Sequence, residues 1–547
     1  MGGQVPDPEG PFARESLMTT IRVSEEAAAP TFRDLPSLVA DHARTRGEAP
    51  ALLCGDARRN WAELDARVDR MTAALQTAGI GRGDTVAMIA RPSIAYVEAF
   101  LATLRAGACA VPLSTMASGE TLSAMIADSD ARLLLADAQH RDLVAPLMAG
   151  LPEIAAGSWI GIDFSGEGWR GLDDWLGDAP ARPAPVAIAP GDRFNIIYSS
   201  GTTGVPKGIV HSHGFRHLRI EGFRTFGFRA DCVTLLATPL YSNTTLVALL
   251  PTLATGGLSV LMPKFDAGGY LALAGRVRPT HTMLVPVQYE RLLAHPDFDR
   301  ADLSSFEMKL STSAPLHAHV KRQILDRWPG GLVENYGLTE GGGSTRLFAH
   351  EHPDKLETVG TPGAGVEIRI LGEDGRELPA GEIGEIVGRA PAMMSGYHKR
   401  PEATEAMLWR DAEGRLFFRS GDMGRFDAEG FLTLLDRKKD MIISGGFNIY
   451  AADLEAVLAR HPDVLDVAVI GVPSAEWGET PRALVVPRPG TAPDPDALRA
   501  WANERLGKTQ RINAVELRSD LPRSTIGKIL KRELRAPYWE GDGKAGA

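Results

Sequence analysis

Helical hydrophobic patterns alternate with short apolar runs through the first two thirds of the chain. Apolar residues recur at helical spacing over 62–78, which stops at Gly79, and again over 94–105. Between and after them, 85–90 and 108–112 are short and almost wholly apolar. Helices that alternate with buried strands favour a largely parallel sheet with helices on its faces. We therefore expect an α/β domain that begins near Thr31.

The pattern changes near residue 380. The segments 382–388, 415–420 and 431–436 are short, rich in β-forming residues and separated by turn residues. After a charged segment at 436–440, a helix is predicted over 452–459, strands over 467–472 and 483–486, and a last long helix over 495–506. Asp494 is the expected N-cap of that helix, with Pro495 at its first position. The chain from 437 to 547 is therefore predicted to form a second, α+β domain.

Composition restricts the classes of function. The 547 residues carry a formal net charge of −10, which argues against a nucleic-acid surface. Cys54, Cys109 and Cys232 are too scattered for a disulfide framework or a thiolate zinc site. No apolar run is long enough for a transmembrane helix, so we expect a cytoplasmic protein. Residues 1–30 are rich in Pro, Gly, Glu and Ala, which predicts a disordered tail before a large domain at 31–436.

A loop with the chemistry of a phosphate site follows the apolar run 194–198. It reads Ser-Ser-Gly-Thr-Thr-Gly-Val-Pro-Lys-Gly over 199–208. Glycines let backbone N–H groups converge on a phosphate, hydroxyls add donors, and the lysine adds a positive charge. It is not the common P-loop, because Lys207 follows a proline and precedes a glycine. The candidate ATP ligands are Ser199, Ser200, Gly201, Thr202, Thr203, Gly204 and Lys207.

Residues 198–208 resemble the signature loop of the adenylate-forming superfamily. That superfamily contains acyl-CoA synthetases, luciferases and the adenylation domains of peptide synthetases. The resemblance extends over nearly the whole chain from about residue 31, because further motifs follow in the family's order. It implies a large domain of mostly parallel sheets with a distorted, β-barrel-like part, and a small, mobile C-terminal domain. It also implies ATP, Mg²⁺ and coenzyme A as reactants or cofactors.

The segment Asn335-Tyr336-Gly337-Leu338-Thr339-Glu340 is similar to the family's adenine and magnesium motif. Tyr336 offers a flat face to a purine, Thr339 a hydroxyl to phosphate, and Glu340 a hard oxygen to Mg²⁺. The resemblance makes Thr202 a second magnesium ligand. Alone, such a hexapeptide is more often a loop and a helix cap; its place after the phosphate loop favours the nucleotide interpretation. The implied ATP contacts are Asn335, Tyr336, Gly337 and Thr339, with Ser313, Ala314 and Pro315 from an upstream segment.

Two further motifs lie near the domain boundary. Asp422, in Ser420-Gly421-Asp422, matches the ribose motif, since a carboxylate can accept both hydroxyls of a ribose. The segment 436–440, Asp-Arg-Lys-Lys-Asp, resembles the interdomain linker. By that resemblance Arg437 contacts the nucleotide, and Lys439 is the hinge of the small domain.

The small domain contributes the remaining motifs. The segment 522–529 resembles the C-terminal catalytic motif, whose lysine corresponds to Lys528 and would balance charge as the carboxylate attacks phosphorus. The nearby Lys531 is expected to be a solvated helix charge. Gly445, Gly446 and Phe447 match the stretch along which the pantetheine arm of CoA passes in relatives. The catalytic set implied is Lys528, Glu340, Thr339 and Lys207.

The acyl-binding residues are where the resemblance is weakest. Ser242 stands where relatives often carry an aromatic residue or histidine, which favours a larger channel. Thr312 and Ser313 replace two glycines, which favours a shorter or more polar one. The expected acyl pocket consists of Tyr241, Ser242, Asn243, Thr312 and Gly341.

These motifs predict an ATP-dependent acid:CoA ligase that forms an acyl-adenylate and then a thioester. The expected acid is fatty, branched-chain or aromatic, of small to medium size. Alternatives are an enzyme that loads a carrier-protein thiol and a non-catalytic nucleotide-binding protein, the latter disfavoured because every charged motif residue is present. The partners expected are the acid, ATP and CoA, and a homodimer is left open.

Overall fold

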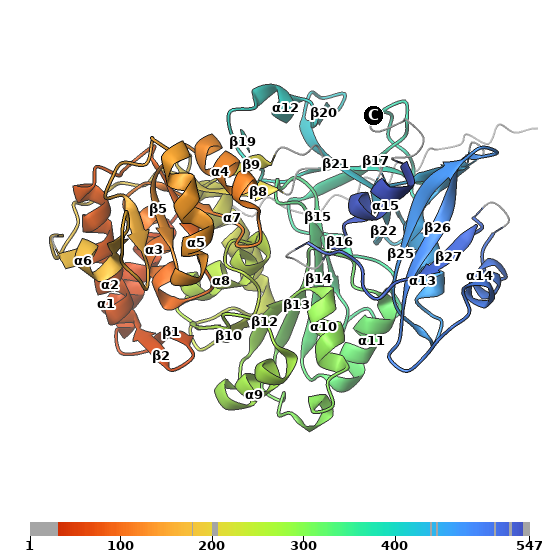
Figure 1. Cartoon of the computed structure of the whole chain (residues 1–547), viewed down its shortest axis with the longest axis horizontal. Helices are drawn as coiled ribbons and strands as arrows, with labels where there is room; N and C mark the ends of the chain where they lie inside the picture. Colours follow the sequence, from red (N-terminus) through yellow and green to blue (C-terminus); the bar gives the residue numbers. More distant parts are fainter. Residues whose placement is uncertain are drawn as a thin grey trace, which may run out of the picture.

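The computed structural model describes residues 31–177, 179–199, 206–437, 440–444, 447–507, 510–524 and 528–539. The predicted tail 1–30, the phosphate-loop residues 200–205, Lys439 and the pair Gly445-Gly446 lie outside these ranges. Within them, the chain forms a large N-terminal domain with three sheets and a small C-terminal domain with one, as the sequence predicts. The small domain lies at the end of the long axis away from helices α1 (Leu35–Arg46) and α2 (Trp61–Thr77) (Figure 1).

A nine-stranded sheet crosses the middle of the large domain in the order β16-β15-β14-β13-β12-β10-β11-β1-β2. Neighbours from β14 to β1 are parallel, whereas the pairs at the two edges are antiparallel. Its strands are β1 (Pro50–Cys54), β2 (Ala57–Asn60), β10 (Val233–Leu236), β11 (Leu258–Leu261), β12 (His281–Leu284), β13 (Met308–Ser311), β14 (Gly331–Gly337), β15 (Ser344–Phe348) and β16 (Thr361–Pro362). Four of the helices between these strands are α8 (Asn243–Thr255), α9 (Ala267–Val277), α10 (Pro286–Leu293) and α11 (Ala318–Arg327).

An eight-stranded sheet follows the order β19-β9-β8-β4-β3-β5-β6-β7 and is parallel from β8 to β7. Its strands are β3 (Thr85–Ile89), β4 (Cys109–Pro112), β5 (Ala131–Ala136), β6 (Trp159–Gly161), β7 (Arg170–Gly171), β8 (Arg193–Ser199), β9 (Lys207–Ser212) and β19 (Gly396–Tyr397). The accompanying helices include α3 (Ile94–Arg105), α4 (Gly119–Asp128), α5 (Arg141–Val144), α6 (Leu172–Gly177) and α7 (His213–Phe223). The predicted alternation of helices and buried strands is confirmed.

Local sequence explains where the first helices start and stop. Asn60 and Glu63 form a capping box at the start of α2, which satisfies two backbone donors that a helix leaves open. Ser93 caps α3 by accepting from the backbone N–H of Tyr96 at 3.1 Å. Both helices match their predicted ranges within one residue.

The third sheet of the large domain is wholly antiparallel. It contains β17 (Glu367–Leu371), β18 (Gly384–Arg389), β20 (Leu408–Arg410), β21 (Leu416–Phe426) and β22 (Leu432–Arg437), with helix α12 (Pro401–Glu405) before β20. The short β-strands predicted after residue 380 are confirmed.

The small domain packs two hydrophobic clusters of its own around a five-stranded sheet. The predicted N-cap Asp494 accepts from Asp496 N at 3.0 Å. The helix that follows ends at Asn503, before the predicted 506, because the Asn503 amide instead binds both backbone groups of Ile512. Lys531 is not solvated as expected: its Nζ pairs with Glu455 Oε1 at 2.9 Å. The elements are β23 (Ile442–Ser444), β24 (Phe447–Ile449), β25 (Val464–Ser474), β26 (Gly478–Pro487), β27 (Ala514–Leu517), α13 (Ala451–Leu458), α14 (Pro495–Asn503) and α15 (Lys531–Trp539).

None of the helices in the described ranges is both long enough and apolar enough to span a bilayer.

The indole of Trp328 is the centre of an aromatic cluster beneath the nine-stranded sheet. It is 1% exposed, and four aromatic rings surround it with centroids 5.0–6.3 Å away. These rings belong to Tyr270, Tyr289, Phe298 and Phe306.

Trp328→Ala should lower the free energy of unfolding of the large domain by about 3–5 kcal/mol, because it removes the indole and leaves a cavity. Denaturant unfolding followed by intrinsic fluorescence and circular dichroism measures the change. Trp477→Ala is the matched control: that indole is 51% exposed, and its loss should change stability by less than about 0.5 kcal/mol. Equal effects of the two variants would contradict the assignment of Trp328 to the core.

Candidate active site

Three predicted ATP residues meet where β14 faces the antiparallel sheet. The Tyr336 hydroxyl donates to Asp422 Oδ2 at 2.9 Å, and Arg437 Nε lies 3.1 Å from Asp422 Oδ1. Asp422 is opposite Arg437 in the register of β21 against β22. Burial and the neighbouring carboxylate raise the pKa of Tyr336 well above its ordinary value, so its phenol remains a donor. Residues predicted from separate motifs therefore form one connected group.

Ser420 fixes the backbone before Asp422. Its Oγ accepts from the N–H of Asp422 at 2.9 Å and donates to the carbonyl of Ile386 on the neighbouring strand β18 at 2.6 Å. Gly421 has a φ of +69°, a conformation that glycine adopts without strain. The motif Ser-Gly-Asp thus forms a bulge within β21, opposite β18, and the Asp422 carboxylate there meets Tyr336.

A second group connects the phosphate loop with the magnesium motif. The Tyr397 hydroxyl donates to Glu340 Oε1 at 2.9 Å, and Lys207 Nζ lies 5.1 Å from the centroid of the Tyr397 ring. Burial, followed by the charge of Glu340, raises the pKa of Tyr397, which keeps its hydroxyl protonated. Strand β19 positions Tyr397 by pairing it opposite Ile209 of β9. Sequence reasoning missed Tyr397, because it lies in none of the motifs.

His211 holds the backbone of the magnesium motif. Its Nε2 lies 2.7 Å from the carbonyl oxygen of Thr339, and its Nδ1 lies 2.9 Å from Arg216 Nη2. Burial and the charge of Arg216 lower the pKa of His211 well below its ordinary value, so the ring is neutral. Nδ1 then accepts from the guanidinium, and Nε2–H donates to the carbonyl. His211 was also missed, although a polar residue within the apolar end of β9 is a signal that could have indicated it.

The loop after Glu340 leaves no room for side chains. Gly341 has a φ of +80°, and a β-carbon there would lie 2.5 Å from the carbonyl oxygen of Ala392. Met394 N donates to the carbonyl of Glu340 at 2.8 Å, which ties the loop to the same segment. The loop is therefore clamped on both sides, and only glycine fits at 341.

Two of the expected acyl-pocket residues begin helix α8. Ser242 is its N-cap, with Oγ 3.2 Å from the N–H of Thr244. Asn243 Oδ1 accepts from Arg216 Nη1 at 2.8 Å. Tyr241, before them, is 8% exposed. Ser242 therefore caps the start of α8.

The segment 312–315 is anchored to the same region. Thr312 Oγ1 donates to the carbonyl of Asn335 at 2.7 Å, and Ser313 Oγ lies 2.5 Å from Thr244 Oγ1. Ser313 has a φ of +79°, a conformation that glycine adopts with less strain than serine. Ala314 is half-buried and Pro315 exposed, and after them Leu316 N donates to the buried Glu334 at 2.8 Å.

Lys528 is tied to Ser524 of the small domain. Its backbone N–H lies 3.1 Å from Ser524 Oγ, and its carbonyl accepts from Ser524 N at 2.7 Å. Arg523, the neighbour of Ser524, pairs with Asp466 at 2.5 Å. Burial and the charge of Asp466 raise the pKa of Glu290, on α10 of the large domain, to about 7. The pair of Arg523 and Asp466 thus lies close to α10. Phe447, expected to contact CoA, is 56% exposed.

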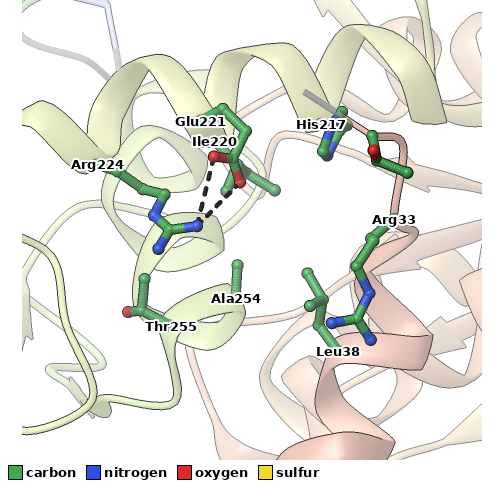
Figure 2. A pocket seen from close by; sticks show the side chains of 9 residues that line it. Arg33, Leu38, His217, Ile220, Glu221, Arg224, Ala254 and Thr255 are labelled. Carbon is green, nitrogen blue, oxygen red and sulfur yellow. Dashed lines mark hydrogen bonds and ion pairs between the residues drawn. The ribbon is translucent and has the colours of Figure 1, made fainter. Parts of the chain in front are cut away.

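A cavity of about 220 Å³ lies elsewhere, between the start of the described chain, α7 and α8 (Figure 2). Arg33, His217, Glu221 and Ala254 are among its lining residues, and none of the predicted site residues is. It is therefore separate from the groups described above.

The chain is similar to known proteins in sequence and in fold. Residues 39–398 match the AMP-binding enzyme family, and residues 453–528 match the AMP-binding enzyme C-terminal domain. The chain is 37% identical to a feruloyl-CoA synthase of Amycolatopsis sp over 500 residues, covering 91% of this chain and 97% of that enzyme. It is 32% identical to the long-chain-fatty-acid–CoA ligase FadD13 of Mycobacterium tuberculosis over 487 residues, or 88% and 94% of the two chains.

Among solved structures, ATP-bound MatB from Rhodopseudomonas palustris superposes with a TM-score of 0.82 at 31% identity. The match covers 92% of this chain and 99% of MatB. The match to the AMP-binding enzyme family extends over more than half of the sequence and includes Lys207, Tyr336, Glu340 and Tyr397. The chain therefore belongs to the AMP-binding enzyme family, in its acyl-CoA ligase branch.

Proposed function

We propose that this enzyme joins a small to medium-sized aromatic or fatty acid to coenzyme A in two half-reactions. The acid's carboxylate attacks the α-phosphorus of ATP, pyrophosphate leaves, and an acyl-adenylate results. The CoA thiolate then attacks the acyl carbonyl, the bond to AMP breaks, and acyl-CoA is released. The observation that supports this proposal is the contact of Tyr336, Asp422 and Arg437, since it brings together residues that separate motifs imply for ATP.

The nucleotide would lie across this surface. Tyr336 would stack on the adenine, and Asp422 with Arg437 would hold the ribose side. Asn335 Oδ1 is buried and has no hydrogen-bond partner in the described part of the chain. This oxygen would accept a hydrogen bond from the nucleotide. The remaining proposed ATP contacts are Ser199, Ser200, Gly201, Thr202, Thr203, Gly204, Lys207, Ser313, Ala314, Pro315, Gly337, Thr339 and Lys528.

Glu340 fits a magnesium ion bound together with ATP. One of its oxygens accepts from Tyr397, and no partner is described for the other among the residues that the structure covers. The described ranges contain no cluster of three His, Cys, Asp or Glu side chains that could hold a metal alone. Mg²⁺ is commonly held by one or two carboxylates and the phosphates of its substrate. The ion would neutralise phosphate charge, with Glu340 and Thr202 as its ligands from the protein.

The acyl end would lie beside α8. Thr312 and Ser313 are fixed by bonds to Asn335 and Thr244, so their side chains occupy space that two glycines would leave open. This supports an acid of small to medium length over a long fatty chain. The feruloyl-CoA synthase relative supports an aromatic acid as the first to test.

The small domain would serve both half-reactions by rotating about Lys439. The boundary proposed between 436 and 437 falls one residue before the end of β22 at Arg437, and the small domain's sheet begins at Ile442. Lys528 would balance charge during adenylation, and Gly445, Gly446 and Phe447 would face the pantetheine arm during thioester formation. Two orientations of the small domain would let the acid's carboxylate attack ATP in the first half-reaction and the CoA thiolate attack the acyl-adenylate in the second.

The proposal is tested by pyrophosphate release in the presence of ATP, Mg²⁺ and a panel of acids, with and without CoA. Acid-dependent pyrophosphate and CoA-dependent thioester are expected, with aromatic and medium-length acids ahead of long-chain ones. Thioester formation on a carrier protein, but not on CoA, would instead support the carrier-loading alternative. A cytoplasmic location and a homodimer stay predictions, which cell fractionation and mass measurement in solution test.

Asp422→Ala should raise the KM for ATP more than the KM for the acid. It removes the carboxylate proposed to bind the ribose hydroxyls, and a hydrogen bond to a charged group contributes about 1.5–3 kcal/mol. Steady-state kinetics with each substrate varied in turn measure both constants. An unchanged ATP dependence would remove Asp422 from the nucleotide site.

Lys528→Ala should slow adenylation by about 10²-fold or more while ATP still binds, because one preorganised charge is lost at the reacting phosphate. Single-turnover pyrophosphate release measures that step. Thioester formation from added acyl-adenylate is the control, since it bypasses adenylation. If both steps fall equally, the proposed role of Lys528 is wrong.

Tyr397→Phe should reduce acyl-adenylate formation about tenfold, because loss of one hydrogen bond to the Glu340 carboxylate is worth about 1.4 kcal/mol or more. It should also raise the Mg²⁺ concentration required for half-maximal rate. Tyr270→Phe is the matched control, since it removes a buried hydroxyl bonded to Thr282, away from the motifs. Equal magnesium dependence in the wild type and Tyr397→Phe would contradict the role given to Tyr397.

A further inference from the structure

Helix α7 presents two different faces. His217, Ile220, Glu221 and Arg224 line the cavity of Figure 2, where Arg224 Nη1 pairs with Glu221 at 3.4 Å. Phe215 lies on the other face: a β-carbon on Gly341 would lie 3.1 Å from its ring. The second face therefore borders the expected acyl pocket, and the helix's one carboxylate is turned away from it.

Arg216 and Arg219 differ in their partners. Arg216 is buried, and its three nitrogens bond Asn195, Asn243 and His211 at 2.8–2.9 Å. Arg219 lies four residues after Phe215, hence on the same side of the helix, one turn farther from Gly341. In the described part of the chain, no hydrogen bond and no ion pair is recorded for Arg219. Its guanidinium lies 5.3 Å from the centroid of the Phe223 ring.

Arg346 reaches the same place from strand β15. Its guanidinium carbon lies 5.5 Å from the centroid of Phe223 and 5.0 Å from that of Phe226. A β-carbon on Gly222 of α7 would lie 3.1 Å from its Nη2. Its Nε is buried without a partner, and its one recorded hydrogen bond, to the Thr225 hydroxyl, is 3.4 Å long.

Two guanidinium groups thus share one aromatic ring with no carboxylate paired to either in the described ranges. Burial, with the charge of Arg346 nearby, lowers the pKa of Arg219 to about 10. Arginine is rarely buried unless it is paired, because an uncompensated charge in a protein interior is costly. Arg219 is only half-buried, so it still has surface open to a ligand. Stacking on Phe223 offsets part of the cost and leaves the N–H donors unused.

We infer that Arg219 and Arg346 bind an oxygen acceptor at the end of the acid substrate opposite its reacting carboxylate. This inference rests on the proposed function, since it requires that the acyl chain run from Gly341 along α7. Guanidinium groups recognise carboxylates in a planar, bidentate way and also donate to phenolic oxygens. The substrate class is therefore an acid with a distal oxygen, supplied either by a second carboxylate or by a ring hydroxyl.

Matched acid pairs separate these two sources. 4-Hydroxycinnamate is compared with cinnamate, and adipate with hexanoate, by acid-dependent ATP–pyrophosphate exchange. In at least one pair the oxygenated acid should have a kcat/KM at least about tenfold higher, because a site built to bond a polar group discriminates against an analogue that lacks it. The pair that shows the preference identifies the source. Preference for the unsubstituted acid in both pairs overturns the inference.

Arg219→Met and Arg346→Met should bring the preferred ratio toward one while retaining exchange with the unsubstituted acid. Arg224→Met is the matched control, because Arg224 directly follows α7, lines the cavity of Figure 2 and should leave the ratio unchanged. If either arginine only packs on Phe223, its variant will alter stability but not the ratio, which removes that arginine from the site.

Absence of exchange with every acid would count against the proposed function, whereas exchange without the preference counts against this inference alone. Should a methionine variant fail to fold, Arg219→Lys and Arg346→Lys, which keep the charge but lose the planar fork, give the same test.

Discussion

The antiparallel pairing of β14 with β15 is the contact on which the rest of the site depends. It ends the parallel order of the nine-stranded sheet and places Asn335 opposite Arg346 and Gly337 opposite Ser344. The loop that joins the two strands carries Glu340, so both ends of that loop are fixed by sheet hydrogen bonds. Because side chains alternate between the faces of a strand, neighbouring residues of this hairpin reach different parts of the molecule. Tyr336 reaches the antiparallel sheet, and Arg346 reaches α7.

The loop itself is held by backbone contacts rather than by its own side chains. His211 holds the carbonyl of Thr339, and Met394 holds that of Glu340. The close approach of Ala392 to Gly341 prevents the loop from moving outward. A carboxylate placed in this way needs little reorganisation to meet a cation, which is the condition under which electrostatic stabilisation of a reaction is largest. Tyr397 contributes the final constraint, because it binds one carboxylate oxygen directly.

Sequence patterns predicted the elements and the motif residues but only part of their arrangement. The ranges of α2 and α3 follow from apolar periodicity and from capping residues, which are local signals. That Tyr336 and Asp422 would share a ligand was predicted from motif chemistry, but their direct hydrogen bond was not. Tyr397 could not be found in this way, since its place depends on how the two-residue strand β19 pairs with β9. Such a short strand has no periodicity, and its register is fixed by tertiary packing.

One buried guanidinium connects the two ends of the site. Arg216 bonds His211, which holds the magnesium motif, and Asn243, which begins the helix beside the expected acyl pocket. Leaving a buried partner of this kind unsatisfied costs about 1–3 kcal/mol, so the two segments cannot shift independently without that loss. A chain with a formal net charge of −10 nevertheless gathers Arg216, Arg219 and Arg346 here. The hydrogen bonds of Arg216 go to neutral partners. Arg219 and Arg346 are therefore not required to hold the loop that carries Glu340. The same helix can therefore fix the loop that carries Glu340 with one arginine and, as we propose, offer another to the substrate.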